Sequence, residues 1–296
     1  AAGAAANISL NGSLDASIAQ QVPCTATAEQ LCTPAAELGS QAVEAAGSGK
    51  CNASEQSYSR DELSQKAVGA GLEALSLAAL AYVFEETENN PSNATIAMRE
   101  RLTEITLAQY DGAFGFVALL DGTTPVVSFA GTDPSQADDV KADVESAVSR
   151  PTSWTASDGV ARAYDVGKGF LRQFDSIKAN ITSAVEALGL SNYDGELIVV
   201  GHSLGGALAN VAAVYFADKF AARVMLRTFG SPRVFTWASA EDIHARLLHD
   251  NGDNSVAPPP AGKICTQRWV NYGDPVPLLP PCESLLGTGG YHHIGN

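Results

Sequence analysis

The chain has few basic residues and no long apolar run. Of its 296 residues, 18 are Lys or Arg and 33 are Asp or Glu, so the formal net charge is −15 at pH 7. This shortage of positive charge argues against a nucleic-acid partner and against tight binding to an anionic membrane surface. No stretch is long and apolar enough to span a bilayer. At most, the composition leaves room for transient contact with a lipid interface.

Cysteine is also scarce. The five cysteines lie toward the two ends of the chain, which suits disulfide bonds that fix terminal segments. None has a histidine at metal-ligand spacing, so the sequence predicts no metal site, and no cofactor is expected. Because their number is odd, they cannot all pair with one another. The candidates for disulfide bonds are Cys24, Cys32, Cys51, Cys265 and Cys282.

Residues 1–59 differ in composition from the rest of the chain. They are rich in Ala, Ser, Thr, Gly and Gln, show little periodicity and contain three of the cysteines. We expect an N-terminal extension over 1–59, clamped by disulfides and glycosylated, and one folded domain over 60–296. The sequence begins without a methionine or a signal-peptide pattern, so we expect any secretion signal to have been removed. Glycosylation sequons, which favour a secreted protein, occur at Asn7, Asn11, Asn52, Asn93 and Asn180.

The most informative stretch is ELIVVGHSLGGALANVAA, residues 196–213. Residues 197–200 are apolar and mostly β-branched, as in a buried strand, and residues 207–220 have helical composition. Between them, Gly201 and Gly205 flank Ser203 at two residues' distance and allow strand and helix to approach closely. This pattern predicts a nucleophile elbow that lifts the Ser203 hydroxyl clear of the sheet. The N–H of Leu204 would then point toward a developing oxyanion.

Hydrophobic patterning predicts the other elements. Strands and helices alternate, which indicates an α/β fold with a mostly parallel central sheet flanked by helices. The predicted helices cover residues 60–84, 93–107, 163–188 and 239–249, and the predicted strands cover 114–120, 125–130, 223–229 and 264–271. Residues 150–161, rich in Pro, Ser and Thr, are expected to form a loop.

Two further candidate residues follow strand ends. Thr132 follows the strand over 125–130, and a glycine then a hydroxyl residue at such a place can offer both an N–H and a hydroxyl to an oxyanion. Asp274 follows the strand over 264–271, as the acid of an α/β-hydrolase triad should. Asp250 and Asp253 are alternatives, but they lie in a polar insertion before that strand.

A set of motifs occurs in one order from about residue 61 to the last residue. They are VVSFAGT, GKGF, LIVVGHSLGGALA, RTFGSPRV, RWVNYGDPVPLLPP and GYHHIG. In these motifs the chain resembles the fungal-type (class 3) lipase family of α/β-hydrolases. The resemblance implies that Ser203 is the nucleophile, Asp274 the triad acid, and Thr132 with Leu204 the oxyanion hole. It also implies a lid after Thr132 and hydrolysis of carboxylic esters, as by the family's secreted members.

The sequence departs from the family pattern at two places. Ala130 stands where the family usually has an arginine, which removes one structural anchor but no oxyanion donor. The expected lid lacks its tryptophan and reads DDVKADVE. Three isolated valines, Val140, Val144 and Val148, offer little apolar surface to an oil interface. We therefore expect short-chain or polar esters as substrates in preference to triglyceride emulsions.

The sequence does not single out one histidine as the base of a Ser–His–Asp relay. His202 is expected to point away from the nucleophile, and His244 and His249 resemble solvated helix positions. That leaves His292 and His293, and the resemblance matches His293 to a family histidine that is usually not catalytic. Either one of these two is the base, or the base lies on a segment absent from this sequence, which the odd cysteine count favours. His293 is the residue named for the role.

These observations predict a secreted ester hydrolase of lipase or esterase type. It would act on an ester or lipid substrate through an acyl-enzyme, without a cofactor. An alternative is a non-catalytic scaffold or binding protein that keeps the lipase-like fold and has lost its catalytic histidine. Acyl transfer to an alcohol in place of water would use the same residues.

Overall fold

The computed structural model describes residues 19–20, 60–86, 88–131, 148–189, 195–220, 222–248, 263–271, 274–281 and 290–295. Of the predicted N-terminal extension, the short strand β1 (Ala19–Gln20) falls within these ranges, where it pairs antiparallel with the end of β10 (Ile264–Asn271). The rest of the extension lies outside the described residues. None of the helices in these ranges is long and apolar enough to cross a membrane.

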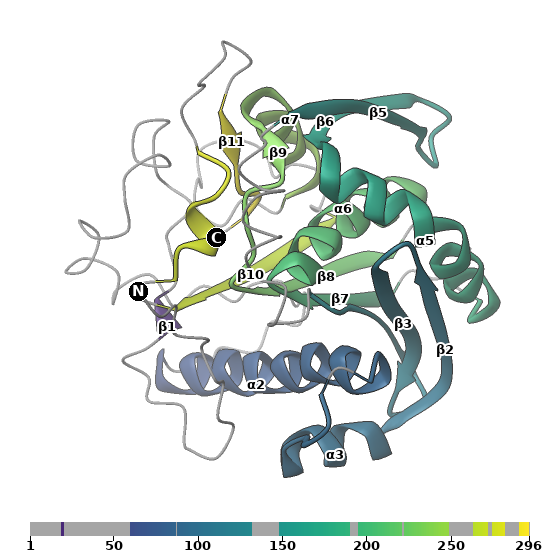
Figure 1. Ribbon diagram of the computed structural model, residues 1–296, viewed down its shortest axis with the longest axis vertical. Helices are drawn as coiled ribbons and strands as arrows, with labels where there is room; N and C mark the ends of the chain where they lie inside the picture. The colour runs from purple at the N-terminus through teal and green to yellow at the C-terminus, as the bar shows by residue number, and fades with distance from the viewer. Residues whose placement is uncertain are drawn as a thin grey trace.

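A seven-stranded sheet forms the centre of the molecule (Figure 1). Its order is β1-β10-β8-β7-β4-β3-β2, and the four neighbours β10, β8 (Arg223–Phe229), β7 (Glu196–His202) and β4 (Thr124–Phe129) are parallel. At the other edge, β3 (Ala113–Leu120) and β2 (Leu102–Tyr110) pair antiparallel. Strands covered on both faces need apolar side chains on both faces. The runs in β3 and β4 meet this need, since nearly every residue there is buried.

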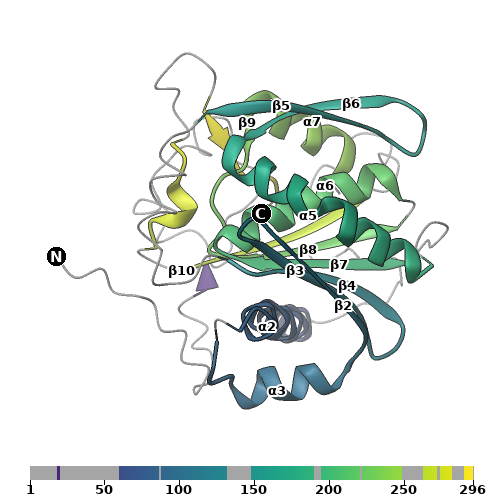
Figure 2. The same ribbon diagram turned by 45° about the vertical axis from the view of Figure 1, so that its right-hand side comes forward.

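Helices cover both faces of the sheet (Figure 2). α2 (Arg60–Phe84) and α3 (Asn93–Glu100) lie on one face, and α5 (Lys168–Ala187) and α6 (Leu204–Lys219) lie on the other. Each face has its own buried apolar cluster, one around Leu77 and Phe116 and the other around Phe174 and Phe216. α6 is buried on nearly all sides, which explains why most of its residues are small or apolar.

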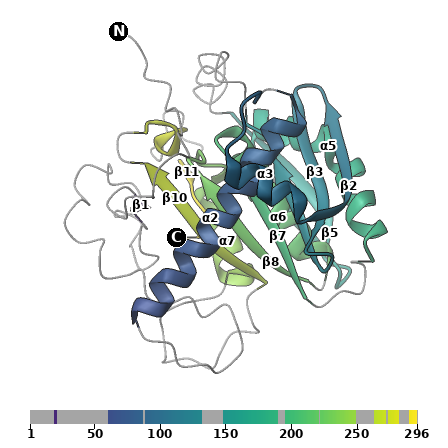
Figure 3. The same ribbon diagram turned by 90° about the horizontal axis from the view of Figure 1, so that it is seen from below.

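A smaller four-stranded antiparallel sheet packs beyond α5 and α6. Its order is β11-β9-β6-β5, formed by β11 (Tyr291–His292), β9 (Phe235–Thr236), β6 (Ala161–Gly167) and β5 (Ser149–Thr155). α7 (Trp237–Leu247) follows β9 directly and contacts β6. Seen from below in Figure 3, α2 crosses the face of the large sheet that is turned to the viewer, where it contacts β7, β4 and β8.

Three predicted elements differ in the structure. The helix predicted over 93–107 is wrong in its second half, because α3 ends at Glu100 and β2 begins at Leu102. The loop predicted over 150–161 contains β5, which pairs along its whole length with β6. For the same reason the helix predicted from residue 163 begins only at Lys168. The other predicted strands and helices occur close to their expected places, except where residues lie outside the described ranges.

Candidate active site

Ser203 occupies the sharp turn between β7 and α6, as the elbow pattern predicts. Its backbone angles are φ 55° and ψ −125°, a combination that residues other than glycine rarely adopt. A hydrogen bond from the Ser203 N–H to the Phe229 carbonyl oxygen, 2.9 Å long, ties the turn to β8. A Cβ on Gly201 would lie 2.1 Å from the Gly205 carbonyl oxygen. Glycine is therefore required for the strand and helix to meet at this turn.

The end of β4 packs directly against the elbow. A Cβ on Gly205 would lie 2.3 Å from the Phe129 carbonyl oxygen, and one on Gly131 would lie 3.3 Å from the Ser203 Cβ. The segment that leads into Thr132 thus runs beside the predicted nucleophile, while Thr132 itself lies outside the described residues. Leu204 is the first residue of α6, so its N–H has no acceptor within the helix. This leaves it available to an oxyanion.

Asp274 reaches the same edge of the sheet from the end of β10. Its Oδ1 accepts a 2.9 Å hydrogen bond from the Val276 N–H, and its Oδ2 lies 3.0 Å from where a Cβ on Gly230 would be. Gly230 follows Phe229, the residue that holds the Ser203 N–H. Burial raises the pKa of the Asp274 carboxyl, and the hydrogen bond from Val276 offsets part of this effect. The structure therefore places Ser203 and Asp274 after the carboxyl ends of β7 and β10, the two strands that flank β8, at the same edge of the sheet.

The structure does not bring His293 to either residue. The His293 Nε2 lies 2.8 Å from the Pro277 carbonyl oxygen and donates its proton there. Burial lowers the pKa of this imidazole well below its usual value, and the charges of Arg268 and Arg233 lower it further. An imidazole held by a backbone carbonyl cannot accept the Ser203 proton through the same nitrogen. The structure therefore shows no hydrogen bond from His293 to Ser203 or Asp274 that would support its predicted role as the base.

The other described histidines are engaged elsewhere. His202 Nδ1 lies 2.8 Å from the Tyr82 hydroxyl, the His292 ring packs at 4.4 Å on Trp237, and His244 Nε2 accepts a 3.4 Å hydrogen bond from the Gly295 N–H. His244 is half-buried and not a solvated helix position as predicted. His249 lies outside the described residues. Among the described histidines, none hydrogen-bonds the Ser203 hydroxyl or the Asp274 carboxylate.

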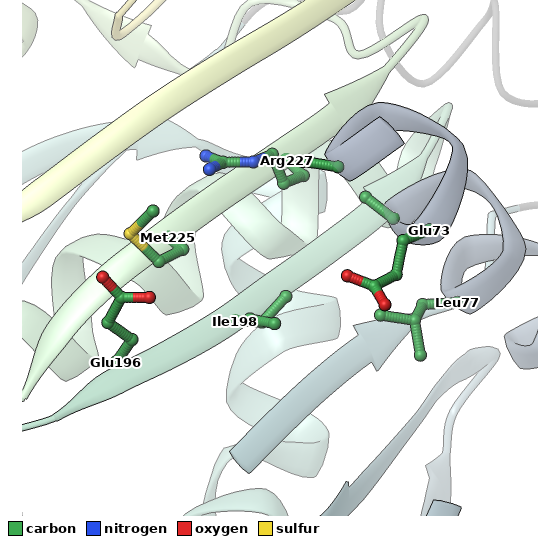
Figure 4. A pocket seen from close by; sticks show the side chains of 8 residues that line it. Glu73, Leu77, Glu196, Ile198, Met225 and Arg227 are labelled. Atoms are coloured by element: carbon green, nitrogen blue, oxygen red, sulfur yellow. The ribbon is translucent and has the colours of Figure 1, made fainter. Parts of the chain in front are cut away.

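A separate pocket lies on the α2 face of the sheet (Figure 4). Its volume is about 220 Å³, and its lining comes from α2, β7 and β8: Ala70, Glu73, Ala74, Leu77, Glu196, Ile198, Met225 and Arg227. Its β7 residues precede the elbow, and the buried Arg227 donates to the carbonyl oxygens of Leu226 and Cys265. This pocket holds no nucleophile and is not the candidate active site. Within the described ranges, no cluster of three His, Cys, Asp or Glu side chains could hold a metal ion.

The modification candidates divide into those inside and those outside the described ranges. Asn93, at the start of α3, and Asn180, on α5, are exposed and accessible to a glycosyltransferase. Cys265, on β10, forms a disulfide bond. The remaining candidates lie outside the described residues: Asn7, Asn11, Asn52, Cys24, Cys32, Cys51 and Cys282.

The sequence of this chain matches one known protein family. The family described as "Lipase (class 3)" matches residues 126–284, more than half of the chain. The chain belongs to the class 3 lipase family. The matched range contains Thr132, Ser203, Leu204 and Asp274, and His293 lies beyond it.

Curated relatives are similar to part of this chain. A "Secreted mono- and diacylglycerol lipase 1" from Fusarium solani is 36% identical over 130 residues, 43% of this chain and 32% of the relative. A "Secreted mono- and diacylglycerol lipase A" from Penicillium cyclopium is 32% identical over 126 residues, 43% of this chain and 34% of the relative. This chain thus matches about a third of the length of these relatives.

Solved structures confirm the predicted α/β-hydrolase fold. The Rhizomucor miehei triacylglyceride lipase superposes with a TM-score of 0.54 and 22% identity, covering 77% of this chain and 78% of that one. The nonglycosylated Yarrowia lipolytica LIP2 lipase gives a TM-score of 0.54 and 18% identity, covering 78% and 79%. These two lipases therefore share the fold of this chain, with its mixed central sheet and flanking helices, at low sequence identity.

Proposed function

We propose that this chain is a secreted carboxylic ester hydrolase with Ser203 as its nucleophile. The observation that carries the proposal is the strained backbone of Ser203, with β4 packed against the turn that holds it. Such strain costs of order 1–3 kcal/mol and persists where the surrounding structure requires it, commonly at functional sites. Relatives named as secreted mono- and diacylglycerol lipases support both the activity and the secreted location.

In the proposed mechanism, the Ser203 hydroxyl oxygen attacks the ester carbonyl carbon while an imidazole accepts the hydroxyl proton. The Leu204 N–H, together with Thr132, stabilises the negative charge on the carbonyl oxygen. The imidazole then gives its proton to the leaving alcohol, and the acyl group stays on Ser203. In the second half of the reaction, the imidazole takes a proton from a water molecule that attacks the acyl carbon, and it returns this proton to the Ser203 oxygen as the acid leaves. Asp274 orients the imidazole, and no cofactor takes part.

The relay needs an imidazole that the described contacts do not supply. Either His293 leaves the Pro277 carbonyl and turns toward Asp274, or an imidazole from outside the described residues approaches the gap between Asp274 and Ser203. We propose the second, because the half-buried His293 is hydrogen-bonded to the Pro277 carbonyl in its present place.

For the substrate, we propose partial glycerides and short-chain or polar esters. The relatives' names specify mono- and diacylglycerols. The sequence after Thr132 is acidic and has only scattered valines, which provides little apolar surface for an oil droplet.

A fluorophosphonate probe tests the nucleophile directly. An activated serine attacks the probe phosphorus and becomes covalently labelled, whereas an ordinary serine does not. We expect labelling of the wild-type chain, located by mass spectrometry on the peptide that contains Ser203, and none in Ser203→Ala. Ser153→Ala, at an exposed serine on β5, is the matched control and should label like the wild type.

The same experiment decides the second candidate function. The absence of a hydrogen bond between Ser203 and any described histidine favours a non-catalytic, lipase-like scaffold or binding protein. If wild-type Ser203 stays unlabelled, and added imidazole in solution does not restore labelling, the scaffold explanation is supported and the hydrolase proposal is wrong. Labelling that appears only with added imidazole would identify a competent nucleophile that lacks its base.

The substrate class needs a separate measurement. Fatty acid release is titrated from mono-, di- and triacylglycerols with the same acyl chain, below and above the concentration at which each forms an interface. We expect the mono- and diacylglycerols to be hydrolysed faster than the triacylglycerol, and soluble esters to be hydrolysed without an interface. Hydrolysis confined to triacylglycerol above its solubility limit would contradict this substrate assignment.

A further inference from the structure

Tyr82, near the end of α2, contacts the elbow from the opposite face of the sheet to α6. Its hydroxyl oxygen lies 2.8 Å from His202 Nδ1, and the two rings are 5.9 Å apart between centroids. His202 immediately precedes Ser203, so this hydrogen bond reaches across 120 residues to the backbone that carries the predicted nucleophile.

The same hydroxyl also contacts the end of β4. The Gly131 N–H donates a hydrogen bond to the Tyr82 oxygen. A Cβ on Gly131 would lie 2.2 Å from this oxygen and 2.7 Å from the His202 carbonyl oxygen. The phenol oxygen therefore sits where the elbow and the segment leading to Thr132 meet, with no space for an additional carbon atom.

Burial fixes the protonation states of this pair. It raises the pKa of the Tyr82 phenol above its usual range, so the phenol keeps its proton. Burial also lowers the pKa of His202 to about 4, so the imidazole is neutral near neutral pH. A protonated phenol beside a neutral imidazole can donate to Nδ1 while it accepts from the Gly131 N–H. The direction of both hydrogen bonds is then constant over the working pH range.

We propose that the Tyr82 hydroxyl is a positioning group that holds the oxyanion-forming segment against the nucleophile. It accepts from Gly131 and donates to His202, and so holds the end of β4, which leads into Thr132, against the turn that carries Ser203. Tyr82 does not touch the substrate. This inference rests on the proposed function, because it concerns the alignment of the two oxyanion donors.

The test compares Tyr82→Phe with Tyr164→Phe. Each variant removes one oxygen from a hydrogen-bonded tyrosine, half-buried at Tyr82 and buried at Tyr164, but Tyr164 bonds Asp218 near the far end of α6. A misplaced oxyanion donor lowers kcat by a smaller factor than a missing one. We therefore expect Tyr82→Phe to lower kcat on a soluble ester ~10- to 100-fold. KM should change less than about twofold. Tyr164→Phe should lower the thermal midpoint and leave kcat unchanged.

A double-mutant cycle with Thr132→Val separates positioning from general destabilisation. If Tyr82 acts through the Thr132 hydroxyl, Tyr82→Phe should lower kcat by a much smaller factor in the Thr132→Val variant than in the wild type. Equal costs in both backgrounds would overturn the inference. So would a Tyr82→Phe variant with wild-type kcat. An inactive, unlabelled wild-type chain would instead be a failure of the proposed function.

Nitrogen NMR of wild-type His202 provides a test that does not depend on whether a variant folds. We expect a neutral ring with its proton on Nε2, because Nδ1 accepts from Tyr82. A ring that carries its proton on Nδ1, or on both nitrogens near neutral pH, would overturn the inference.

Discussion

His293 Nε2 lies 2.8 Å from the Pro277 carbonyl oxygen, three residues beyond Asp274. This bond joins the last described segment of the chain to the short 3₁₀ helix at Val276–Leu278, which follows Asp274 directly. The imidazole therefore helps to hold the loop that carries the predicted triad acid. Its contacts are those of a half-buried structural histidine and not those of a proton relay.

This structural role predicts the behaviour of two substitutions. His293→Gln keeps a side-chain donor, whereas His293→Ala leaves the Pro277 carbonyl without one. We expect His293→Ala to lower the free energy of unfolding by about 1–3 kcal/mol and His293→Gln to lower it less. The rate of fluorophosphonate labelling per folded molecule should stay within about threefold of the wild type in both. A loss of labelling in both variants would instead identify His293 as the base.

Four histidines predict how stability depends on pH. Burial lowers the pKa of His202 and of His292 to about 4, and it also lowers the pKa of His244 and His293. The unfolded chain binds protons at these residues near pH 6.5, whereas the folded chain does not. Stability should therefore fall as the pH drops below 6.5, by about 1.4 kcal/mol per pH unit for each such histidine.

Urea unfolding at a series of pH values measures this decline. The raised pKa of Asp274 acts in the opposite direction, because the folded state takes up that proton first. The histidine effect is therefore best measured between pH 6.5 and about 5. His292→Gln removes one of the four imidazoles and should give a shallower decline than the wild type. Constant stability across this interval would show that the folded chain accepts these protons.

The sequence predicted the elbow well because its glycines report a local constraint. Gly201 is required by its contact with the Gly205 carbonyl inside the turn, so a five-residue pattern contains much of the information, although Gly205 is required by the Phe129 carbonyl of β4. The start of β2 is a different case. Residues 93–107 begin with a capped helical turn at Ser92, and nothing local shows that the following Thr and Ile residues will pair with β3.

Contacts between distant segments account for the rest of what sequence patterns could not show. β5 contains Pro151 and was expected to be a loop, but it is the edge strand of the small sheet, where proline is tolerated. Tyr82 lies within the helix predicted over residues 60–84. Its bond to His202 spans 120 residues, and no local pattern could have revealed it. The engagement of His293 with Pro277 likewise depends on how the chain end folds back.

The close approach of β4 to the elbow predicts the effect of one added methyl group. Gly131→Ala would place its Cβ 2.2 Å from the Tyr82 hydroxyl oxygen. We expect a loss of about 1–3 kcal/mol in stability and loss of most of the labelling of Ser203, because β4 must move away from the elbow. Gly169→Ala, in α5 with no atom within 4 Å of the added Cβ, is the control. It should be neutral or slightly stabilising in thermal unfolding, and wild-type labelling in Gly131→Ala would contradict the predicted crowding.

A buried carboxylate and an exposed one share the same arginine, which allows a matched comparison. Asp218, 3% exposed, accepts from Trp154 Nε1 at 2.8 Å and from the Tyr164 hydroxyl at 2.5 Å, and its other oxygen lies 3.6 Å from Arg246. Asp242 pairs with Arg246 at the surface, with its side chain 48% exposed.

Asp218→Asn should therefore lower the free energy of unfolding by about 3 kcal/mol, because the amide replaces one carboxylate oxygen by a donor at a buried site where Trp154 and Tyr164 both donate. Asp242→Asn should change it by less than about 0.5 kcal/mol. Urea unfolding followed by tryptophan fluorescence measures both, since Trp154 reports on the buried site. Neither variant should alter the labelling of Ser203, which lies at the other end of α6. Equal effects of the two substitutions would show that burial contributes nothing to the strength of the Asp218 contacts.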